Sequence, residues 1–465
     1  MGRVAVRTDR LTSPFLQEST PMPFQSSKVS NWLQRSPASV LVFWSVAGAF
    51  MTYFSMYAFR KPFTVSDYQD LYLGGVDYKL VLILSQILGY ALSKMVGIKV
   101  VSEMTPHRRA WSIIVLVAIA HGALLIYALV PQWAKPLCLF LNGLPLGMVF
   151  GCVFGFLEGR QVTEALAAGL CASFIMASGV VKSVGASLME YYGVSLFWMP
   201  FLTALLFWPT LVLGVWILEQ IPQPNRGDLV YRAPRTPIDG TERMRFFRRY
   251  APGFVVLVLI MTLLTVFRSV RDDYAREIWS AFGQSKPGLF AQSETLVAVL
   301  ITVISAAVVF LRNNVRAFLT AMVVTAISFV CALITIGCHW NVETWSEASA
   351  FRFMVLIGIC LYVPYVLFHT TIFERIIAML RNKSNFGFLM YVSDFVGYLS
   401  TVILLFTVSM ISRENINFLQ LLLWLAIIIC PVSIAGSIMV MIYFPRRAVA
   451  PDEVTGNDPD LEPAQ

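Results

Sequence analysis

The sequence predicts an all-α, polytopic membrane protein with twelve spanning helices in two six-helix halves. The chain has 465 residues, of which 57% are hydrophobic and only 13% are charged, whereas soluble proteins carry roughly 25% charged residues. Apolar runs recur along the chain, and each has the ~20 residues that cross ~30 Å of hydrocarbon. Only helices and closed barrels satisfy their backbone groups in lipid, and these runs are too long for barrel strands.

The apolar runs and the polar breaks between them divide the chain into spans and domains. A single long polar segment, 220–251, contains several prolines and arginines and is expected to be a cytoplasmic connector. It separates an N-terminal half, 38–219, from a C-terminal half, 252–444, and the tails are 1–37 and 445–465. We place the spans at 38–60, 80–102, 111–131, 136–157, 165–189, 195–219, 252–270, 289–311, 316–338, 352–378, 386–411 and 416–444.

The distribution of positive charge predicts the orientation. With both termini in the cytoplasm, the cytoplasmic segments hold most of the 35 lysines and arginines, as the positive-inside rule requires. We therefore expect a multi-pass protein of the cell membrane with both ends inside. The net charge of +8 is explained by these loops and need not indicate nucleic acid. We expect a monomer whose partners are the lipid bilayer and a small solute.

Ionisable side chains inside the predicted spans are the candidate site, because they are costly in hydrocarbon. Four are cations, each with a structural alternative. Arg60 and Arg268 could be anchors that reach the interface, and Arg268 could also pair with Asp272 at i+4. Lys94 could form a structural pair with Asp394. The four cations are Arg60, Arg268, Lys94 and Lys182.

Three further groups could titrate within the spans. Asp394 lies in the eleventh span and Glu294 in the eighth, and we expect one of them to neutralise a cation in the empty protein. His369, in the tenth span, is either a hydrogen-bonded core residue or a proton carrier. The seven cysteines show no metal-ligand spacing, and we expect neither a metal site nor a cofactor.

The charge balance within the spans indicates an anionic ligand. Four cations against two carboxylates leave an excess of about +2, which is very unfavourable in a low dielectric. A phosphate ester carries up to about −2 near neutral pH. The planar guanidinium of arginine suits such a ligand because it makes bidentate hydrogen bonds to phosphate.

Several short motifs resemble the organophosphate:phosphate antiporters of the major facilitator superfamily. The first span is tyrosine-rich and ends in an Arg-Lys pair, and the second, seventh and eighth spans carry matching polar residues. The motifs are Tyr53-Phe-Ser-Met-Tyr57-Ala-Phe-Arg60-Lys61, Gly89-Tyr90-Ala91-Leu92-Ser93-Lys94, Arg268 with Asp273-Tyr274, and Glu294. The resemblance implies rocker-switch exchange, two arginines that bind the phosphoryl group, and a site lined by Tyr53 and Tyr57.

The sequence departs from that family in places. The family's histidine in the fifth span has no counterpart; Met176 lies near its position, with Lys182 close by. The loop after the second span lacks the usual Gly-x-x-x-Asp-Arg pattern. The stretch around Arg60 is also similar to a bacterial family of unassigned function.

Several functions remain open from the sequence. The leading prediction is a secondary transporter that exchanges a phosphorylated metabolite for phosphate. The alternatives are a carrier of a non-phosphorylated anion and a transporter-like receptor that senses such a ligand. We expect no enzyme, because no nucleophile–base pair or metal cluster is evident. No phosphate-binding loop of an ATP-driven pump is present.

Overall fold

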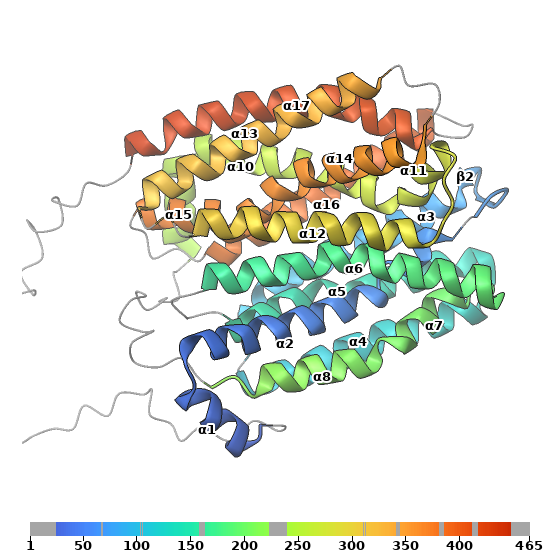
Figure 1. The fold of residues 1–465 in the computed structure, drawn as a ribbon, viewed down its shortest axis with the longest axis horizontal. Coiled ribbons are helices and arrows are strands. Elements are labelled where there is room, and N and C mark those ends of the chain that lie inside the picture. Colours follow the sequence, from blue (N-terminus) through green and yellow to red (C-terminus); the bar gives the residue numbers. More distant parts are fainter. Residues whose placement is uncertain are drawn as a thin grey trace, which may run out of the picture.

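The computed structural model describes residues 25–447 except 67, 103, 105, 158–162, 223–239, 310, 312, 341–344, 381–385 and 412–416. The described chain is a bundle of long helices that run side by side (Figure 1). Most of both expected tails and most of the expected connector therefore lie outside the described residues. The long helices are α2 (Ala38–Ala58), α3 (Tyr78–Ser102), α4 (Pro106–Leu129), α5 (Lys135–Leu157), α6 (Thr163–Tyr192), α10 (Gly240–Asp273), α12 (Gly288–Val309), α13 (Asn314–His339), α14 (Glu347–Leu367), α16 (Phe386–Ile411) and α17 (Phe418–Tyr443).

Short elements complete the described structure. They are α1 (Ser27–Arg35), α7 (Met199–Leu206), α8 (Trp208–Glu219), α11 (Ala275–Ala281), α15 (Phe373–Met379), the 3-10 turns η1 (Pro62–Val65), η2 (Gln132–Ala134) and η4 (Pro445–Arg447), the π-helical turn η3 (Phe368–Ile372), and the strands β1 (Tyr72–Leu73) and β2 (Val76–Asp77).

The predicted all-α membrane fold is confirmed. Eleven helical segments of the described chain are long and apolar enough to span a membrane, and a bent pair makes up to twelve. The pair is α7 and α8, which meet at 43°. Pro209 stands in the first turn of α8, where its missing N–H and its ring break the helix. This bend divides the span expected at 195–219.

The helices form two groups. In the first group α3 and α4 pack against α5, and α2 packs against α6 and α8. In the second, α10 packs against α16 and α17, and α13 packs against α14 and α17. The groups meet mainly along α6 with α12 and along α3 with α16. A Cβ on Gly179 of α6 would lie 2.2 Å from the backbone oxygen of Phe290 in α12, so this close approach requires glycine.

The two ends of the bundle differ. At one end β1 and β2 form an antiparallel hairpin in which Tyr72 pairs with Asp77 and Leu73 with Val76. Gly74 and Gly75 have φ of 61° and 80°, the conformation that a tight hairpin turn needs. We call this the hairpin end. At the opposite, terminal end, α2 begins and α17 finishes (Figure 1).

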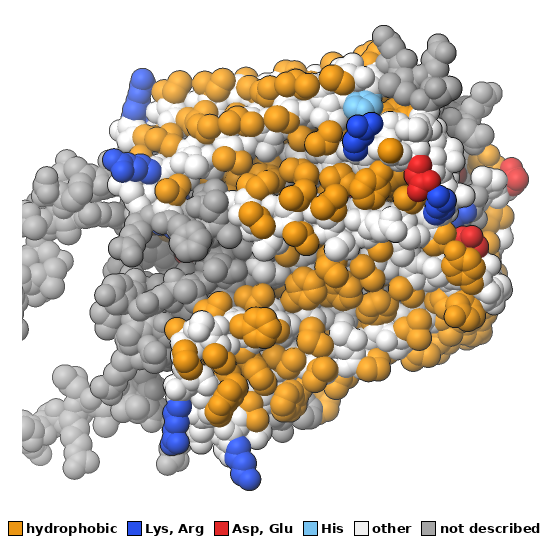
Figure 2. Space-filling model, in the orientation of Figure 1, with side chains coloured by type: hydrophobic (Ala, Val, Ile, Leu, Met, Phe, Trp, Pro, Cys, Tyr) orange, Lys and Arg blue, Asp and Glu red, His pale blue; other side chains and the backbone are white. Residues whose placement is uncertain are grey.

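The outer surface of the bundle is apolar. Large side chains such as Phe43, Val303 and Ile428 are 75%, 66% and 62% exposed. On the face in Figure 2, the coloured charged side chains lie toward the two ends, with apolar side chains between them. This pattern is expected of a protein whose solvent is lipid.

Two helices differ from the spans expected from the sequence in ways that affect the site. α10 begins at Gly240, inside the expected connector, and continues to Asp273, beyond the expected limit at 270. The span expected at 352–378 is interrupted by η3, whose five residues are all buried. It follows Pro364 in α14. π-helical turns often occur at functional sites.

Candidate functional site

Six cationic side chains lie buried between the two helix groups. They are accompanied by four buried carboxylates, and all ten side chains belong to residues that are only 1–8% exposed. Six cations against four carboxylates leave an excess of two positive charges. The count of four cations and two carboxylates made from the sequence gave the same excess. The ten are Arg60, Lys61, Lys94, Lys182, Arg268 and Arg271, with Asp272, Asp273, Glu294 and Asp394.

The first set of ion pairs ties the groups together on the hairpin side. Lys61 Nζ lies 2.5 Å from Asp272 Oδ2 and 2.5 Å from Asp273 Oδ1. Lys182 Nζ lies 2.6 Å from Asp272 Oδ1 and donates to the backbone oxygen of Asp272 at 2.5 Å. Ser178 also donates to Asp272. Lys61 follows α2 and Lys182 lies on α6, whereas both aspartates end α10, so these pairs cross between the groups.

Further contacts close the same side. Lys79 pairs with Glu277, and Arg276 Nη1 donates to the backbone oxygen of Val65 at 2.9 Å. Ser183 Oγ donates to the backbone oxygen of Pro287 at 2.6 Å. The structure is therefore joined at the hairpin end by several polar contacts between the groups.

Arg271 is held within the second group. Its Nη2 lies 2.7 Å from Glu294 Oε1 and donates to the backbone oxygen of Met354 at 2.8 Å. A Cβ at Gly358 would lie 2.7 Å from the same nitrogen. The guanidinium is thus fixed by α12 and α14, and Glu294 neutralises it.

Lys94 and Asp394 form the structural pair considered from the sequence. Lys94 Nζ on α3 lies 3.1 Å from Asp394 Oδ2 on α16. The other carboxylate oxygen, Oδ1, lies 3.2 Å from His369 Nε2. His369 Nδ1 lies 2.8 Å from the backbone oxygen of Tyr365. His369 is therefore a hydrogen-bonded buried residue, and it contacts an ionisable partner.

Arg60 has no carboxylate partner among the described residues. Its guanidinium carbon lies 3.8 Å from the ring centroid of Tyr90, 5.6 Å from that of Tyr398 and 5.9 Å from that of Tyr57. Its Nε is buried without a hydrogen-bond partner. Aromatic faces stabilise a cation without neutralising it, so the positive charge of Arg60 remains available.

Arg268 repeats this arrangement in the second group. Its guanidinium carbon lies 4.5 Å from the ring centroid of Tyr365 and 5.9 Å from that of Tyr362. Its Nε also lacks a partner. The suggested surface pair with Asp272 is wrong: Asp272 is buried and binds Lys61 and Lys182. Since all four carboxylates bind other cations, the excess of two charges resides on Arg60 and Arg268.

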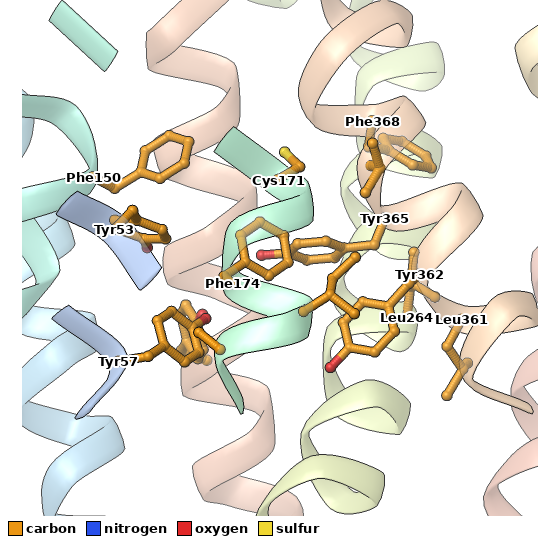
Figure 3. Close-up of a cluster of buried hydrophobic side chains, with 14 of the residues drawn as sticks. Tyr53, Tyr57, Phe150, Cys171, Phe174, Leu264, Leu361, Tyr362, Tyr365 and Phe368 are labelled. Atoms are coloured by element: carbon orange, nitrogen blue, oxygen red, sulfur yellow. The ribbon is translucent and has the colours of Figure 1, made fainter. Parts of the chain in front are cut away.

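Aromatic rings connect the surroundings of the two arginines. Tyr57 lies 6.3 Å from Phe174, and Phe174 lies 5.6 Å from Tyr365, as ring centroids. Tyr53 packs on Phe150 at 5.4 Å. Figure 3 shows these rings converging from α2, α5, α6 and α14. The rings of Tyr57, Phe174 and Tyr365 thus join the surroundings of Arg60 and Arg268 into one aromatic cluster.

The two unpaired arginines provide hydrogen-bond donors suited to an anion. Two unneutralised guanidinium groups, one from each helix group, offer planar donors to the oxygens of a tetrahedral or carboxylate group. Within the described residues no group of three His, Cys, Asp or Glu side chains could hold a metal ion. All seven cysteines are free thiols.

A family model matches residues 62–447, which is most of the chain and includes eight of the ten buried charged residues, all but Arg60 and Lys61. Its description is "Family of unknown function (DUF5690)". The chain belongs to this family. No curated protein matches the chain.

Solved structures similar to this DUF5690 member show the fold. A structure of a D-xylose-proton symporter matches with a TM-score of 0.53 and 10% identity, covering 89% of this chain and 99% of that chain. A structure from a study of proton dependent oligopeptide transporters matches with a TM-score of 0.57 and 12% identity, covering 88% and 100%. The expected major facilitator fold is thereby confirmed.

The structure places the predicted site residues together but gives them different surroundings. Arg60, Arg268, Tyr53 and Tyr57 belong to the aromatic cluster, while Lys94 lies at its edge, 5.5 Å from the ring centroid of Tyr90. Lys182 is buried between the groups as expected, but its amine is held by Asp272. Glu294 pairs with Arg271, which was not among the four cations considered.

Four of the ten charged residues were not identified as site residues from the sequence. Lys61, Arg271, Asp272 and Asp273 all follow the expected limits of their spans, at 60 and 270, and were assigned to the outer boundary. In the structure η1 is fully buried after Lys61, and α10 continues to Asp273. Each of the four lies within five residues after Arg60 or Arg268, and this closeness to a predicted site residue was the available signal.

Proposed function

We propose that this chain is a secondary transporter of a small organic anion and works by alternating access. The single observation that supports it most is the pair of buried arginines, one per helix group, that no carboxylate neutralises. Burying two unpaired charges is costly unless a ligand supplies the counter-charge. The aromatic cluster around them holds their side chains in place without competing for their hydrogen bonds.

The proposed ligand is a phosphorylated metabolite exchanged for phosphate, as in the organophosphate:phosphate antiporters that the motifs resemble. A phosphoryl dianion matches the excess of two charges. Its oxygens can bridge Arg60 and Arg268 through bidentate hydrogen bonds. Because the arginines come from different groups, such a ligand would favour the state in which the groups close around it.

The ion pairs at the hairpin end take part in this cycle. With both termini in the cytoplasm of a cell-membrane protein, the hairpin end faces outside, and the structure is closed on that side. Opening to the outside then requires Lys61 to leave Asp272 and Asp273 and Lys182 to leave Asp272. The halves 38–219 and 252–444 would move against each other, with 220–251 as the cytoplasmic connector.

Exchange in proteoliposomes tests this function. Vesicles that contain the purified chain are loaded with radiolabelled phosphate, and its release is followed on addition of phosphate monoesters, carboxylates or neutral sugars outside. We expect monoesters and phosphate to accelerate release and neutral sugars to have no effect. Acceleration by carboxylates alone would favour a carrier of non-phosphorylated anions. Binding without any flux would favour the receptor function.

A further inference from the structure

One cluster of buried ionisable groups has no task in anion binding itself. Asp394 lies between Lys94 and His369, with one carboxylate oxygen toward each, at 3.1 Å and 3.2 Å. The three side chains come from α3, α16 and η3 and belong to residues that are 2–4% exposed. This cluster bears on the coupling of transport, and the inference below rests on the proposed anion transport.

The two hydrogen-bond neighbours of His369 leave a place for one extra proton. A neutral imidazole has one donor nitrogen and one acceptor nitrogen. Both neighbours of His369 are acceptors: the backbone oxygen of Tyr365 at Nδ1 and the carboxylate of Asp394 at Nε2. A neutral ring beside an ionised carboxylate can donate to only one of these acceptors, and its other nitrogen then faces an oxygen lone pair, at 3.2 Å or 2.8 Å. One more proton, on His369 Nε2 or on Asp394 Oδ1, makes the contact favourable.

A second buried histidine shows the opposite case. His121 accepts a hydrogen bond at Nδ1 from Trp208 Nε1 at 2.7 Å, and its Nε2 lies 3.3 Å from the backbone oxygen of Phe201. One donor and one acceptor are what the neutral ring needs. His121 therefore requires no extra proton and offers a matched control.

The charge of the His369–Asp394 pair depends on few neighbouring charged groups. Lys94 is the charged group in direct contact with it, and the other titratable groups packed around it are tyrosines and a cysteine. They come from α3, α6, α14 and α16 and are Tyr90, Cys171, Tyr365, Tyr391 and Tyr398. Deprotonation of the pair therefore leaves Lys94 to neutralise Asp394 alone.

A single aromatic ring separates the cluster of Lys94, Asp394 and His369 from each of the two arginines. The ring of Tyr365 lies 4.3 Å from that of His369 and 4.5 Å from the guanidinium carbon of Arg268. The ring of Tyr90 lies 3.8 Å from the guanidinium carbon of Arg60 and 5.5 Å from Lys94 Nζ. An anion bound to the arginines therefore lies close enough to favour one more positive charge at the pair.

We propose that the His369–Asp394 pair is a proton-coupling site that takes up one proton when the anion binds to Arg60 and Arg268. The proton comes from the aqueous solution on the open side and is shared between Nε2 and Oδ1. After the groups rock and the anion leaves, it returns to the solution on the other side. Net movement of the anion is then symport with one proton. Because linkage is reciprocal, protonation of the pair also strengthens anion binding.

Isothermal titration calorimetry of the purified full-length chain tests the proposal. The probe is methyl phosphate, a monoester that is almost wholly dianionic at pH 8. Titrations from pH 7 to 9, in two buffers with different ionisation enthalpies, give the number of protons taken up per anion bound. We expect a maximum near one for the wild type and for His121→Gln. We expect almost none for His369→Gln and Asp394→Asn, with binding retained within about tenfold.

The outcomes separate the two proposals. Binding of methyl phosphate without proton uptake at any pH, or with equal uptake in His369→Gln and the wild type, overturns the coupling site and leaves the anion site intact. Failure of methyl phosphate to bind to any of these proteins overturns the anion site, and the coupling site with it. If His369→Gln does not fold, Asp394→Asn decides the question by the same readout.

Discussion

Two successive residues at the end of α2 show two ways to bury a positive charge. The amine of Lys61 lies 2.5 Å from two carboxylates, whereas the guanidinium of Arg60 is faced by tyrosine rings and no carboxylate of the described residues pairs with it. The same contrast recurs one turn apart on α10, between Arg271, which binds Glu294, and Arg268, which faces Tyr365. The paired cations connect the structure, and the unpaired cations are left for a ligand.

Removing a buried cation that is paired with carboxylates should have the largest effect on stability. Lys61→Met leaves Asp273 and part of Asp272 as buried charges, and removal of one partner of such a pair costs about 3–5 kcal/mol. We expect the free energy of unfolding, measured by denaturant titration in detergent micelles, to fall by that amount. A loss below about 1 kcal/mol would show that the pairs at the hairpin end do not hold the groups together.

Removing a buried cation that has no carboxylate partner should have a smaller effect on stability and should not lower it. Arg60→Met takes away a buried charge that has no counter-charge, which is favourable, but also its contact with Tyr90, worth about 2 kcal/mol when desolvated. We expect the free energy of unfolding to stay the same or rise by up to about 2 kcal/mol, while phosphate exchange is lost. A loss of stability as large as that of Lys61→Met would remove the distinction between the two residues.

The ring that faces Arg60 sharpens the comparison with a still smaller effect. Tyr90→Phe keeps the aromatic face and loses only the hydroxyl, so it should change the free energy of unfolding by at most about 1 kcal/mol. Tyr90→Leu removes the face and should lower it by about 1–2 kcal/mol. Thermal unfolding of both variants in the same detergent measures the difference. Equal values for Phe and Leu would mean that the ring contributes volume only.

The sequence predicted the fold well because the bilayer fixes the length of each span. Every expected span coincides with a helix or a pair of helices, and even the bent pair α7 and α8 occupies the expected 195–219. The distribution of partners could not be predicted in the same way. Lys61 and Asp272 are far apart in the sequence, and each has the local context of a membrane boundary. Their burial depends on how the two groups meet.

The candidate site was predicted in part for the same reason. Arg60 and Arg268 were recognisable as charges within apolar runs, and the excess of two positive charges survives in the structure. The count from the sequence spread that excess over four cations, however, because the additional carboxylates lay outside the expected spans. Only the structure shows that Asp272 forms an ion pair with Lys182 and that Glu294 forms one with Arg271.

We infer that the unpaired arginines, and not the paired ones, bind the anion. The most direct measurement is the affinity for methyl phosphate of Arg60→Lys, Arg268→Lys and Arg271→Lys, each folded as judged by its unfolding transition. A lysine cannot replace the bidentate fork, and the loss of charge-assisted hydrogen bonds of about 1.5–3 kcal/mol each should raise Kd roughly 10- to 150-fold for the first two. Arg271→Lys should stay within about threefold of the wild type, because its partner is Glu294. Equal losses of affinity for all three variants, or near-normal affinity for the first two, would show that Arg60 and Arg268 have no special part in binding the anion.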